Sequence, residues 1–467
     1  MEFVELKDVK ITGVNSEGRG VGRSENFAKV LFVKGAVPEE TVNVKITKEE
    51  KNFALGEVSE IVKSSDFRAK PLCQHYGVCG GCNMQHVTYA GQLIAKKKQV
   101  EDAFKKLAKL ENPNILEIIP SKKEFEYRNK MDFQFSNLSW IVNESETKLD
   151  VKSLDRRVLG LHVEGRFDRV LNIENCHLQG GKVNEIRNFI RDFAINSKTT
   201  FYNPKYKKGI LRNLIFRTNA KGELMIIIIF GEPPRVLQAE LCMALKRTFP
   251  EITSLFWGVN KKEADTIDET KLFAFIGEDS LSEEIAGMKF KINAKSFAQV
   301  NTEMLSVMVE KVLEVGDFKE TDIVYDLYSG IGSFSLPIAK KVAKVCGIEI
   351  SKFSSNDAKE NASLNKISNI KFTKGDVAEV LTEDFIIENS PANAWVIDPP
   401  RAGVSTKMIA KILEFVPEKI IYISCNPATL ARDFSLISSR YKLVKALPLD
   451  MFPQTNHVET ICLFEKI

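Results

Sequence analysis

The chain has 467 residues, of which 44% are hydrophobic and 27% charged, with a net charge of +4. This composition is typical of a soluble globular protein, and the length predicts two or three domains rather than one core. The N-terminus lacks the pattern of a secretory signal, and the longest apolar run, LMIIIIF at 224–230, is too short to span a bilayer. These features argue against secreted and membrane proteins and predict a cytoplasmic one.

Two domains are predicted before residue 286. Residues 1–62 alternate in hydrophobicity as strands do and are interrupted by EGRGVG and KGAVPEE, which predict turns in a small β-barrel. Residues 63–285 contain a cysteine cluster, a helical stretch at 89–110 and strands such as KMDFQFSNLSW. We therefore expect a central domain of mixed α+β structure.

The last predicted domain, 286–467, alternates strand and helix patterns. Such alternation indicates an α/β domain with a doubly wound parallel sheet. The predicted strands are DIVYDL at 322–327, KVCGIEI at 344–350, NIKFTKGD at 369–376, AWVIDPP at 394–400 and KIIYISC at 419–425.

Basic residues are unevenly distributed. Residues 63–110 hold nine basic and three acidic groups, and residues 201–217 hold five basic groups, no acidic ones and several aromatics. Clusters of this kind are usually solvated surface, but they are also what a polyanion-binding face needs. Residues 1–62 hold nine basic and eleven acidic groups, so we do not expect the barrel to be a general electrostatic anchor.

Four of the eight cysteines form a candidate metal site. Cys73, Cys79 and Cys82 lie within ten residues, and Cys176 stands alone in NIENCHLQ. Clustered thiols in a reducing compartment indicate metal or cluster ligation. Spacing alone leaves zinc, with His75 or His86 as possible substitutes for a thiolate, and an iron-sulfur cluster equally open. We expect the cysteines in apolar helix or strand contexts, Cys242, Cys346 and Cys462, to be core residues.

Acidic residues follow several strands of the last domain. The first strand runs into DLYSGIGSFS, which contains Gly330, and the next three strands are followed by Glu349, Asp376 and Asp398. Open α/β sheets bind ligands at this carboxyl edge, where an acid accepts the hydroxyls of a ribose. Since no phosphate-binding loop of the P-loop type is present, S-adenosylmethionine suits these acids better than a nucleotide. At the end of the fifth strand stands Cys425, either a core thiol or a nucleophile.

Several motifs together resemble the RNA 5-methyluridine methyltransferases, specifically the iron-sulfur branch that modifies 23S ribosomal RNA. The resemblance covers essentially the whole chain. The motifs are C-x5-C-x2-C with a distant fourth cysteine, SFAQVN at 296–301, DLYSGIGSF at 326–334, GIE at 347–349, DPPRAG at 398–403, SCNPATLARD at 424–433 and FPQTNHVE at 452–459.

This resemblance implies a fold and a set of roles. It implies a Rossmann-like S-adenosylmethionine methyltransferase domain, an N-terminal OB-like barrel of the TRAM type and a central iron-sulfur domain. Gln299, Tyr328, Glu349 and Asp398 would contact the methyl donor, Cys425 would be the nucleophile and Glu459 the base. The same resemblance favours a 4Fe-4S cluster on Cys73, Cys79, Cys82 and Cys176.

The implied reaction explains why a thiol is needed. Carbon 5 of uracil becomes nucleophilic once a thiolate adds to carbon 6, and a base must later remove the carbon 5 proton. D-P-P loops also occur in amino methyltransferases, which need no thiol. For His457 we expect a structural role.

We therefore expect a monomer that methylates a flipped uridine in 23S ribosomal RNA, with neither DNA nor membrane as a partner. The same reaction on transfer RNA, or a non-catalytic RNA-binding or assembly factor, are the alternatives.

Overall fold

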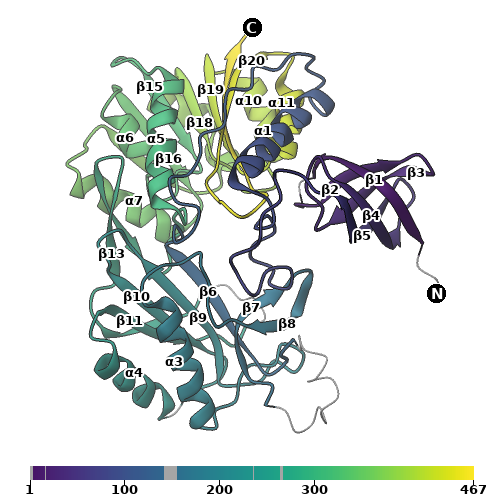
Figure 1. Ribbon diagram of the computed structural model, residues 1–467. Coiled ribbons are helices and arrows are strands. Elements are labelled where there is room, and N and C mark those ends of the chain that lie inside the picture. The colour runs from purple at the N-terminus through teal and green to yellow at the C-terminus, as the bar shows by residue number, and fades with distance from the viewer. Residues whose placement is uncertain (1–3, 16, 141–154, 235, 263–266) are drawn as a thin grey trace. The chain divides into compact units, whose positions relative to one another are not determined.

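The computed structural model describes residues 4–15, 17–140, 155–234, 236–262 and 267–467 (Figure 1). Contacts divide the chain into two compact units. Unit 1 comprises residues 1–72, 83–124 and 304–467, and unit 2 comprises residues 73–82 and 125–303. The domain boundaries at 62 and 285 stay a prediction. Among the described residues, no helix is long and apolar enough to cross a membrane.

The N-terminal strands of unit 1 close into a five-stranded barrel with the order β1-β2-β3-β5-β4. Alternate residues such as Val9, Ile11, Leu31 and Val33 fill its interior, as the predicted period of two requires. The sequence-based prediction of a barrel is confirmed. Its strands are β1 (Glu5–Val14), β2 (Gly20–Ser24), β3 (Phe27–Lys34), β4 (Thr41–Glu49) and β5 (Phe53–Lys63).

The C-terminal part of unit 1 is a seven-stranded sheet with the order β17-β16-β15-β18-β19-β21-β20. All neighbours from β17 to β19 pair in parallel, and β21 is antiparallel to both β19 and β20. This order confirms the predicted Rossmann-like domain. The strands are β15 (Ile323–Leu327), β16 (Lys344–Glu349), β17 (Ile370–Lys374), β18 (Ala394–Ile397), β19 (Lys419–Ser424), β20 (Tyr441–Leu449) and β21 (Glu459–Lys466).

Helices cover this sheet, and one of them comes from far up the chain. Helix α1 (Tyr89–Lys106) packs against α11, and its Val100 and Phe104 join the core of the sheet. Residues 83–124 therefore belong to the same compact unit as this sheet. The other helices are α5 (Thr302–Gly316), α6 (Ser335–Ala339), α7 (Lys352–Leu364), α8 (Val377–Val380), α9 (Glu383–Asn389), α10 (Thr406–Phe415) and α11 (Pro427–Ile437).

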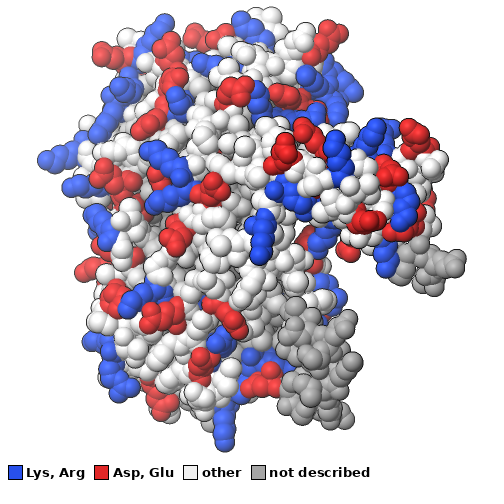
Figure 2. Space-filling view, viewed as in Figure 1, with Lys and Arg blue, Asp and Glu red and all other residues white. Residues whose placement is uncertain are grey.

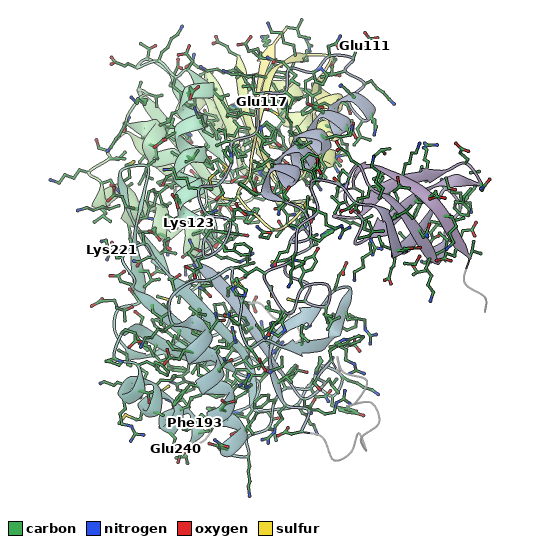
Figure 3. All side chains as sticks on the ribbon, viewed as in Figure 1. Glu111, Glu117, Lys123, Phe193, Lys221 and Glu240 are labelled. Carbon is green, nitrogen blue, oxygen red and sulfur yellow. The ribbon has the colours of Figure 1, made fainter. Side chains whose placement is uncertain are left out.

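Unit 2 is built on another seven-stranded sheet, ordered β12-β11-β10-β9-β6-β7-β8. Helices α3 and α4, which carry the Phe193 and Glu240 labels in Figure 3, pack over one face. Strand β10, LMIIIIF, is buried throughout, because alternate residues join two different apolar clusters. The elements are β6 (Lys130–Ser136), β7 (Val158–Val163), β8 (Arg166–Asn172), α3 (Val183–Asn196), β9 (Leu211–Thr218), β10 (Leu224–Phe230), α4 (Leu237–Thr248), β11 (Ile252–Val259), β12 (Leu272–Ile276), and the hairpin β13 (Ser280–Ile285) and β14 (Met288–Asn293).

Candidate active site

Cys425 and Glu459 stand opposite each other at the carboxyl edge of the unit 1 sheet. Strand β19 ends at Ser424, which pairs with Thr460 of the antiparallel strand β21. One step further in this register places Cys425 opposite Glu459, and facing residues of an antiparallel pair have Cβ atoms about 4.5–5.5 Å apart. A thiol and a carboxyl group, 34 positions apart in the printed sequence, thus share one end of two neighbouring strands.

The turn after Cys425 is built by the next two residues. Asn426 caps α11, and its Oδ1 accepts hydrogen bonds from Ala428 N (3.0 Å) and Thr429 N (3.5 Å). Pro427 occupies the first turn of the helix, where its missing N–H costs nothing. The sequence SCNPA therefore ends a strand, leaves Cys425 half-buried at the edge and starts a helix at once.

Two buried carboxyl groups, Asp326 and Glu459, and the half-buried Asp398 form a chain of interacting acids in this region. Burial raises the pKa of Asp326 to about 7. The Ser335 hydroxyl, which donates a hydrogen bond to Asp326, acts in the opposite direction and lowers this pKa. Burial and the charge of Asp326 raise the pKa of Asp398 to about 7, and burial and Asp398 raise that of Glu459 to about 8. Such a cluster of acids is expensive when ionised, so it favours a cation as its ligand.

Two of these acids, Glu459 and Asp398, also raise the pKa of the Cys425 thiol. Its pKa rises to about 11 because of burial first, and then because of Glu459 and Asp398, while Arg401 acts in the opposite direction. The free protein therefore holds a protonated thiol at neutral pH. A positive charge brought into the site would favour its thiolate form.

The glycine-containing turn after β15 is tied to the end of β16. Both Tyr328 N and Ser329 N donate to Ile348 O at 3.0 Å. Glu349 accepts from Gly330 N at 2.9 Å and, through its other oxygen, from Ser351 N at 2.6 Å. The structure thus brings the predicted residues Tyr328, Gly330 and Glu349 together around one turn.

The backbone of this turn is unusual at Tyr328, where φ is +74°. A left-handed conformation in a residue with a large side chain costs on the order of 1 kcal/mol or more and is typical of functional sites. The half-buried ring feels nearby charges: its pKa is raised to about 12 by burial first, then by Asp376 and Asp433.

Two predicted cofactor residues have a different setting. Asp376 is exposed, and its Oδ1 caps α8 by accepting from Ala378 N at 2.9 Å. Gln299 belongs to unit 2, where its carbonyl oxygen accepts from Asn129 Nδ2 at 3.1 Å. The cofactor roles of both residues stay predictions.

Asp433 holds the DPPRAG loop against β19. One of its oxygens accepts from the Tyr422 hydroxyl (2.6 Å) and from Val404 N (2.9 Å), and the other accepts from the Arg432 guanidinium. Arg432 also donates to Ala402 O at 2.8 Å. This anchor sets the loop that begins at Asp398.

The four candidate ligand cysteines all belong to unit 2 and are free thiols, each half-buried. Cys79 and Cys176 pack against the same apolar cluster of Val163, Leu171 and Ile173. Burial raises the pKa of Cys79 to about 11, and the charges of Cys176 and Cys73 raise it further. Cys73, Cys79 and Cys176 therefore lie near one another, although no three His, Cys, Asp or Glu side chains among the described residues are arranged to hold a metal ion.

The histidines considered as substitute ligands are engaged elsewhere. His75 Nε2 accepts from Glu174 N at 3.1 Å. His86, which belongs to unit 1, is buried with its Nε2 3.4 Å from Ala36 O, and burial lowers its pKa to about 4. These contacts leave the thiols as the donor set.

Comparison with known proteins shows the family of this chain. The tRNA (Uracil-5-)-methyltransferase family matches residues 275–467, and the TRAM domain matches residues 4–59. An uncharacterized RNA methyltransferase of Bacteroides thetaiotaomicron is 40% identical over 453 residues, covering 96% of this chain and 99% of the relative. One of Porphyromonas gingivalis is 38% identical, covering 98% and 99%. The chain belongs to the RNA uracil-5-methyltransferase family.

The fold of this RNA uracil-5-methyltransferase has also been seen in a solved structure. The tRNA (uracil-54, C5)-methyltransferase of Pyrococcus abyssi, in complex with S-adenosyl-L-homocysteine, superposes with a TM-score of 0.73 and 24% identity. The match covers 98% of this chain and 100% of the other. The family makes this protein an RNA methyltransferase, and the solved structure shares its fold.

Several residues of the methyltransferase site escaped sequence reasoning. Asp326 and Asp433 lie inside quoted motifs, and an acid within an otherwise apolar strand was a usable signal for Asp326. The partners of the 450–458 loop, Gln92 and Lys96, carried no such signal, because their contacts are more than 350 residues away in sequence.

Proposed function

We propose that this enzyme methylates carbon 5 of a specific uridine in 23S ribosomal RNA, with Cys425 as nucleophile and Glu459 as base. The observation that carries the proposal is the register that sets Cys425 opposite Glu459 beside Asp398. A half-buried thiol at the sheet edge is accessible to a ligand, whereas Cys346 and Cys462 are buried in the core.

The chemical steps use these two side chains in turn. The thiol proton of Cys425 and the carboxyl proton of Glu459 first pass to solvent, a loss that the positive charge of a bound S-adenosylmethionine favours. The Cys425 thiolate then adds to carbon 6 of the flipped uracil, and the electron pair of the 5,6 double bond moves toward the ring carbonyl as an enolate. Carbon 5 takes up the methyl group that S-adenosylmethionine supplies, and S-adenosylhomocysteine is the leaving group. The Glu459 carboxylate then removes the carbon 5 proton, the double bond re-forms, and the bond between sulfur and carbon 6 breaks.

The environment of Glu459 suits a base. A general base works best when its pKa lies near the operating pH, and burial with Asp398 brings the pKa of Glu459 to about 8. Because Glu459 is only 2% exposed, the proton that it takes up is shielded from water.

The residues around the glycine turn fit the methyl donor. Glu349 is held by two backbone N–H groups and keeps lone pairs for the hydroxyls of a ribose. The acids of the site complement a cationic ligand, and Tyr328 lies near two further acids, Asp376 and Asp433. We assign donor binding to Tyr328, Gly330, Glu349, Asp376 and Asp398, and the resemblance adds Gln299 to this list.

Cys73, Cys79, Cys82 and Cys176 would hold a 4Fe-4S cluster. In support, Cys176 lies near enough to raise the pKa of both Cys73 and Cys79, and His75 and His86 have other partners. The thiolates that bind an iron-sulfur cluster lie farther apart than those that bind a single metal ion. This wider spacing agrees with cysteines that lie near one another but are not close enough to bind one ion together. Ligation would fasten Cys176 to the 73–82 segment.

RNA contact is expected from the TRAM barrel and from part of the basic central segment. Lys205, Lys207 and Lys208 are exposed beside Tyr206, whose side chain is 65% exposed. Arg212 and Arg217 are buried instead, donating to Asn260 O (2.9 Å) and to Ser296 O (2.5 Å). Only the lysine part of this segment therefore suits phosphate binding. On the barrel, basic and acidic side chains are mixed (Figure 2).

The test is to map 5-methyluridine by mass spectrometry in 23S ribosomal RNA and transfer RNA from a deletion strain. Loss from one 23S position, restored by wild-type protein and not by Cys425→Ala, is the expected result. Loss from transfer RNA alone would favour transfer RNA as the substrate, which is the substrate that the name of the Pyrococcus abyssi enzyme states. Unchanged 5-methyluridine in both would refute the proposal.

A further inference from the structure

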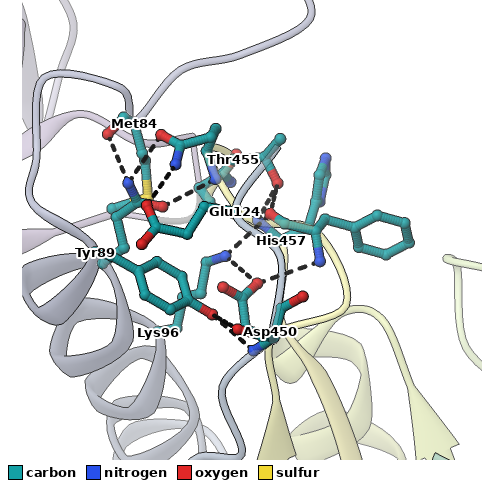
Figure 4. A network of polar contacts seen from close by, with 12 residues as sticks. Met84, Tyr89, Lys96, Glu124, Asp450, Thr455 and His457 are labelled. Atoms are coloured by element: carbon teal, nitrogen blue, oxygen red, sulfur yellow. Dashed lines mark hydrogen bonds and ion pairs between the residues drawn. The ribbon is translucent and has the colours of Figure 1, made fainter. Parts of the chain in front are cut away.

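We propose that three side chains, Asn83 from the loop before α1 and Gln92 and Lys96 from the buried face of α1, act as positioning residues for the base Glu459. We call them the loop clamp, because they hold residues 450–456, the segment that leads to Glu459. Figure 4 shows Lys96 of this clamp against Asp450. The inference rests on the proposed function, in which Glu459 removes the carbon 5 proton.

The connection held by the clamp is longer than the strands require. Strands β20 and β21 are antiparallel neighbours, and such neighbours are commonly joined by two residues. Here residues 450–458 lie between them. The conformation of these nine residues determines how the chain enters β21 at Glu459.

The clamp begins with a buried ion pair. Lys96 Nζ lies 2.5 Å from Asp450 Oδ1, and both side chains are fully buried. The same ammonium donates to Phe452 O at 3.1 Å, and Phe452 N donates to Asp450 Oδ1 at 3.2 Å. Burial of an ion pair is a poor way to gain stability, since well-packed apolar residues often do as well. A buried pair does define one geometry for the groups that it contacts.

One helical turn earlier, Gln92 holds Gln454. Gln454 N donates to Gln92 Oε1 at 2.9 Å, and Gln92 Nε2 donates to Gln454 Oε1 at 3.1 Å. Gln454 O accepts from Asn83 N and Met84 N, both at 3.1 Å. These bonds keep Gln454 at φ +68°, a conformation that its side chain disfavours and that needs outside support.

Asn83 completes the clamp nearest to the base. Asn456 N donates to Asn83 Oδ1 at 2.9 Å, and Asn83 Nδ2 donates to Asn456 Oδ1 at 2.5 Å. Clamp contacts therefore fall on residues 450, 452, 454 and 456, the last of them three residues before Glu459. A displacement of this segment would move Glu459 relative to Cys425 without touching either side chain.

The test separates the base-dependent step from methyl transfer. Single-turnover reactions on an RNA transcript give the rate of S-adenosylhomocysteine formation and, on denaturing gels, the rate at which the methylated covalent adduct resolves. The variants are Lys96→Met with Asp450→Leu, which replaces the ion pair by apolar groups, and Asn83→Ala. Lys98→Met with Asp102→Leu is the matched control, since this pair lies on the exposed side of the same helix.

We expect both clamp variants to resolve the adduct about tenfold or more slowly, as partial loss of a general base would, with methyl transfer changed less than about threefold. The control should match the wild type. Equal slowing of both steps together with a lower melting temperature, or no slowing in a folded variant, would overturn the inference. If Lys96→Met with Asp450→Leu does not fold by circular dichroism, Asn83→Ala decides.

The same assay distinguishes a wrong positioning role for the loop clamp from a wrong proposed function for the enzyme. Glu459→Gln should accumulate the methylated adduct in the same assay. A wild type that forms no adduct refutes the mechanism, whereas adduct accumulation in Glu459→Gln without accumulation in folded clamp variants refutes only the positioning role.

Discussion

Cys425 lies opposite Glu459 because β21 runs antiparallel to β19 and pairs Thr460 with Ser424. A parallel last strand would carry its carboxyl end, not its start, to this edge, so the residue that begins β21 would lie at the far end of the sheet. The reversal of one strand therefore brings the motif FPQTNHVE to the thiol of SCNP. Both side chains occupy the edge at which open α/β sheets bind ligands.

The first prediction concerns the nucleophile. Cys425→Ala should abolish formation of 5-methyluridine and of any covalent adduct, because no enolate forms without addition at carbon 6. RNA with 5-fluorouridine at the target should trap the wild type and fail to trap this variant on a denaturing gel. Cys346→Ala, which changes a core thiol of the same sheet, is the control and should still be trapped. Methylation by Cys425→Ala would return this thiol to a structural role.

The second prediction uses the raised pKa of Glu459. The folded protein holds this proton up to about pH 8, whereas an unperturbed carboxyl loses it near 4.5. Between these values the folded state binds more protons than the unfolded state, so the free energy of unfolding falls as pH rises. Glu459→Gln should remove part of that fall.

The measurement is the melting temperature of the cofactor-free protein from pH 5 to 9. The free energy of unfolding of Glu459→Gln should rise relative to that of the wild type as the pH increases. The expected difference is on the order of a few kcal/mol, since one pKa unit corresponds to about 1.4 kcal/mol. Glu465→Gln alters a partly exposed residue of the same strand, paired with Lys442, and should run parallel to the wild type. Parallel curves for all three proteins would contradict the ionisation argued for Glu459.

The third prediction concerns the methyl donor. Glu349→Ala removes an acceptor for the ribose and also frees Gly330 N and Ser351 N. Hydrogen bonds to a charged group contribute about 1.5–3 kcal/mol, so S-adenosylmethionine should bind roughly 10- to 100-fold more weakly by calorimetry. Glu379→Ala, an exposed acid paired with Lys407, should bind normally. Wild-type affinity in Glu349→Ala would place the donor elsewhere.

The sequence predicted the layers of the fold because its periodicities are local. Strand runs such as IYIS and AWVI, and the turn residues after them, specify a parallel sheet and its carboxyl edge without further information. Likewise, residues that end neighbouring strands must share one edge, so Glu349 and Cys425 were recognisable as site candidates from order alone.

What the sequence could not give is pairing between distant segments. The helix at 89–106 carries an ordinary amphipathic pattern, in which Lys96 looks like a surface residue of a basic run, yet its ammonium is buried against Asp450. In the same way Arg212 and Arg217 read as surface charges, although each is buried on backbone carbonyls. Only tertiary contacts separate a buried charge from a solvated one.

The fourth prediction tests the cysteine cluster. Anaerobically purified protein should be brown and hold about four iron atoms per chain. Cys176→Ser should lose iron and lower the melting temperature, because ligation joins Cys176 to a segment about a hundred residues away. Cys242→Ser is the control, a thiol in the apolar core of the same unit, and should keep its iron. Stoichiometric zinc without iron would refute the cluster.

The last prediction concerns the loop that begins at Asp398. Gly403 has φ +78°, and a Cβ added there would meet Asp433 Oδ2 at 2.4 Å. Gly403→Ala should therefore strain the backbone and also displace Asp433 from Val404 N and the Tyr422 hydroxyl, which moves the loop and slows methyl transfer.

The control is Gly287→Ala, which has φ +72° with nothing within 4 Å of the new methyl group. It carries the same backbone strain, about 1 kcal/mol or more, without the collision. The expected result is a loss of melting temperature in both variants that is larger in Gly403→Ala, with methylation reduced only in Gly403→Ala, measured as the rate of 5-methyluridine formation on an RNA transcript. Equal activity in the two variants would show that Asp433 and its loop tolerate displacement and that the position of Asp398 does not depend on them.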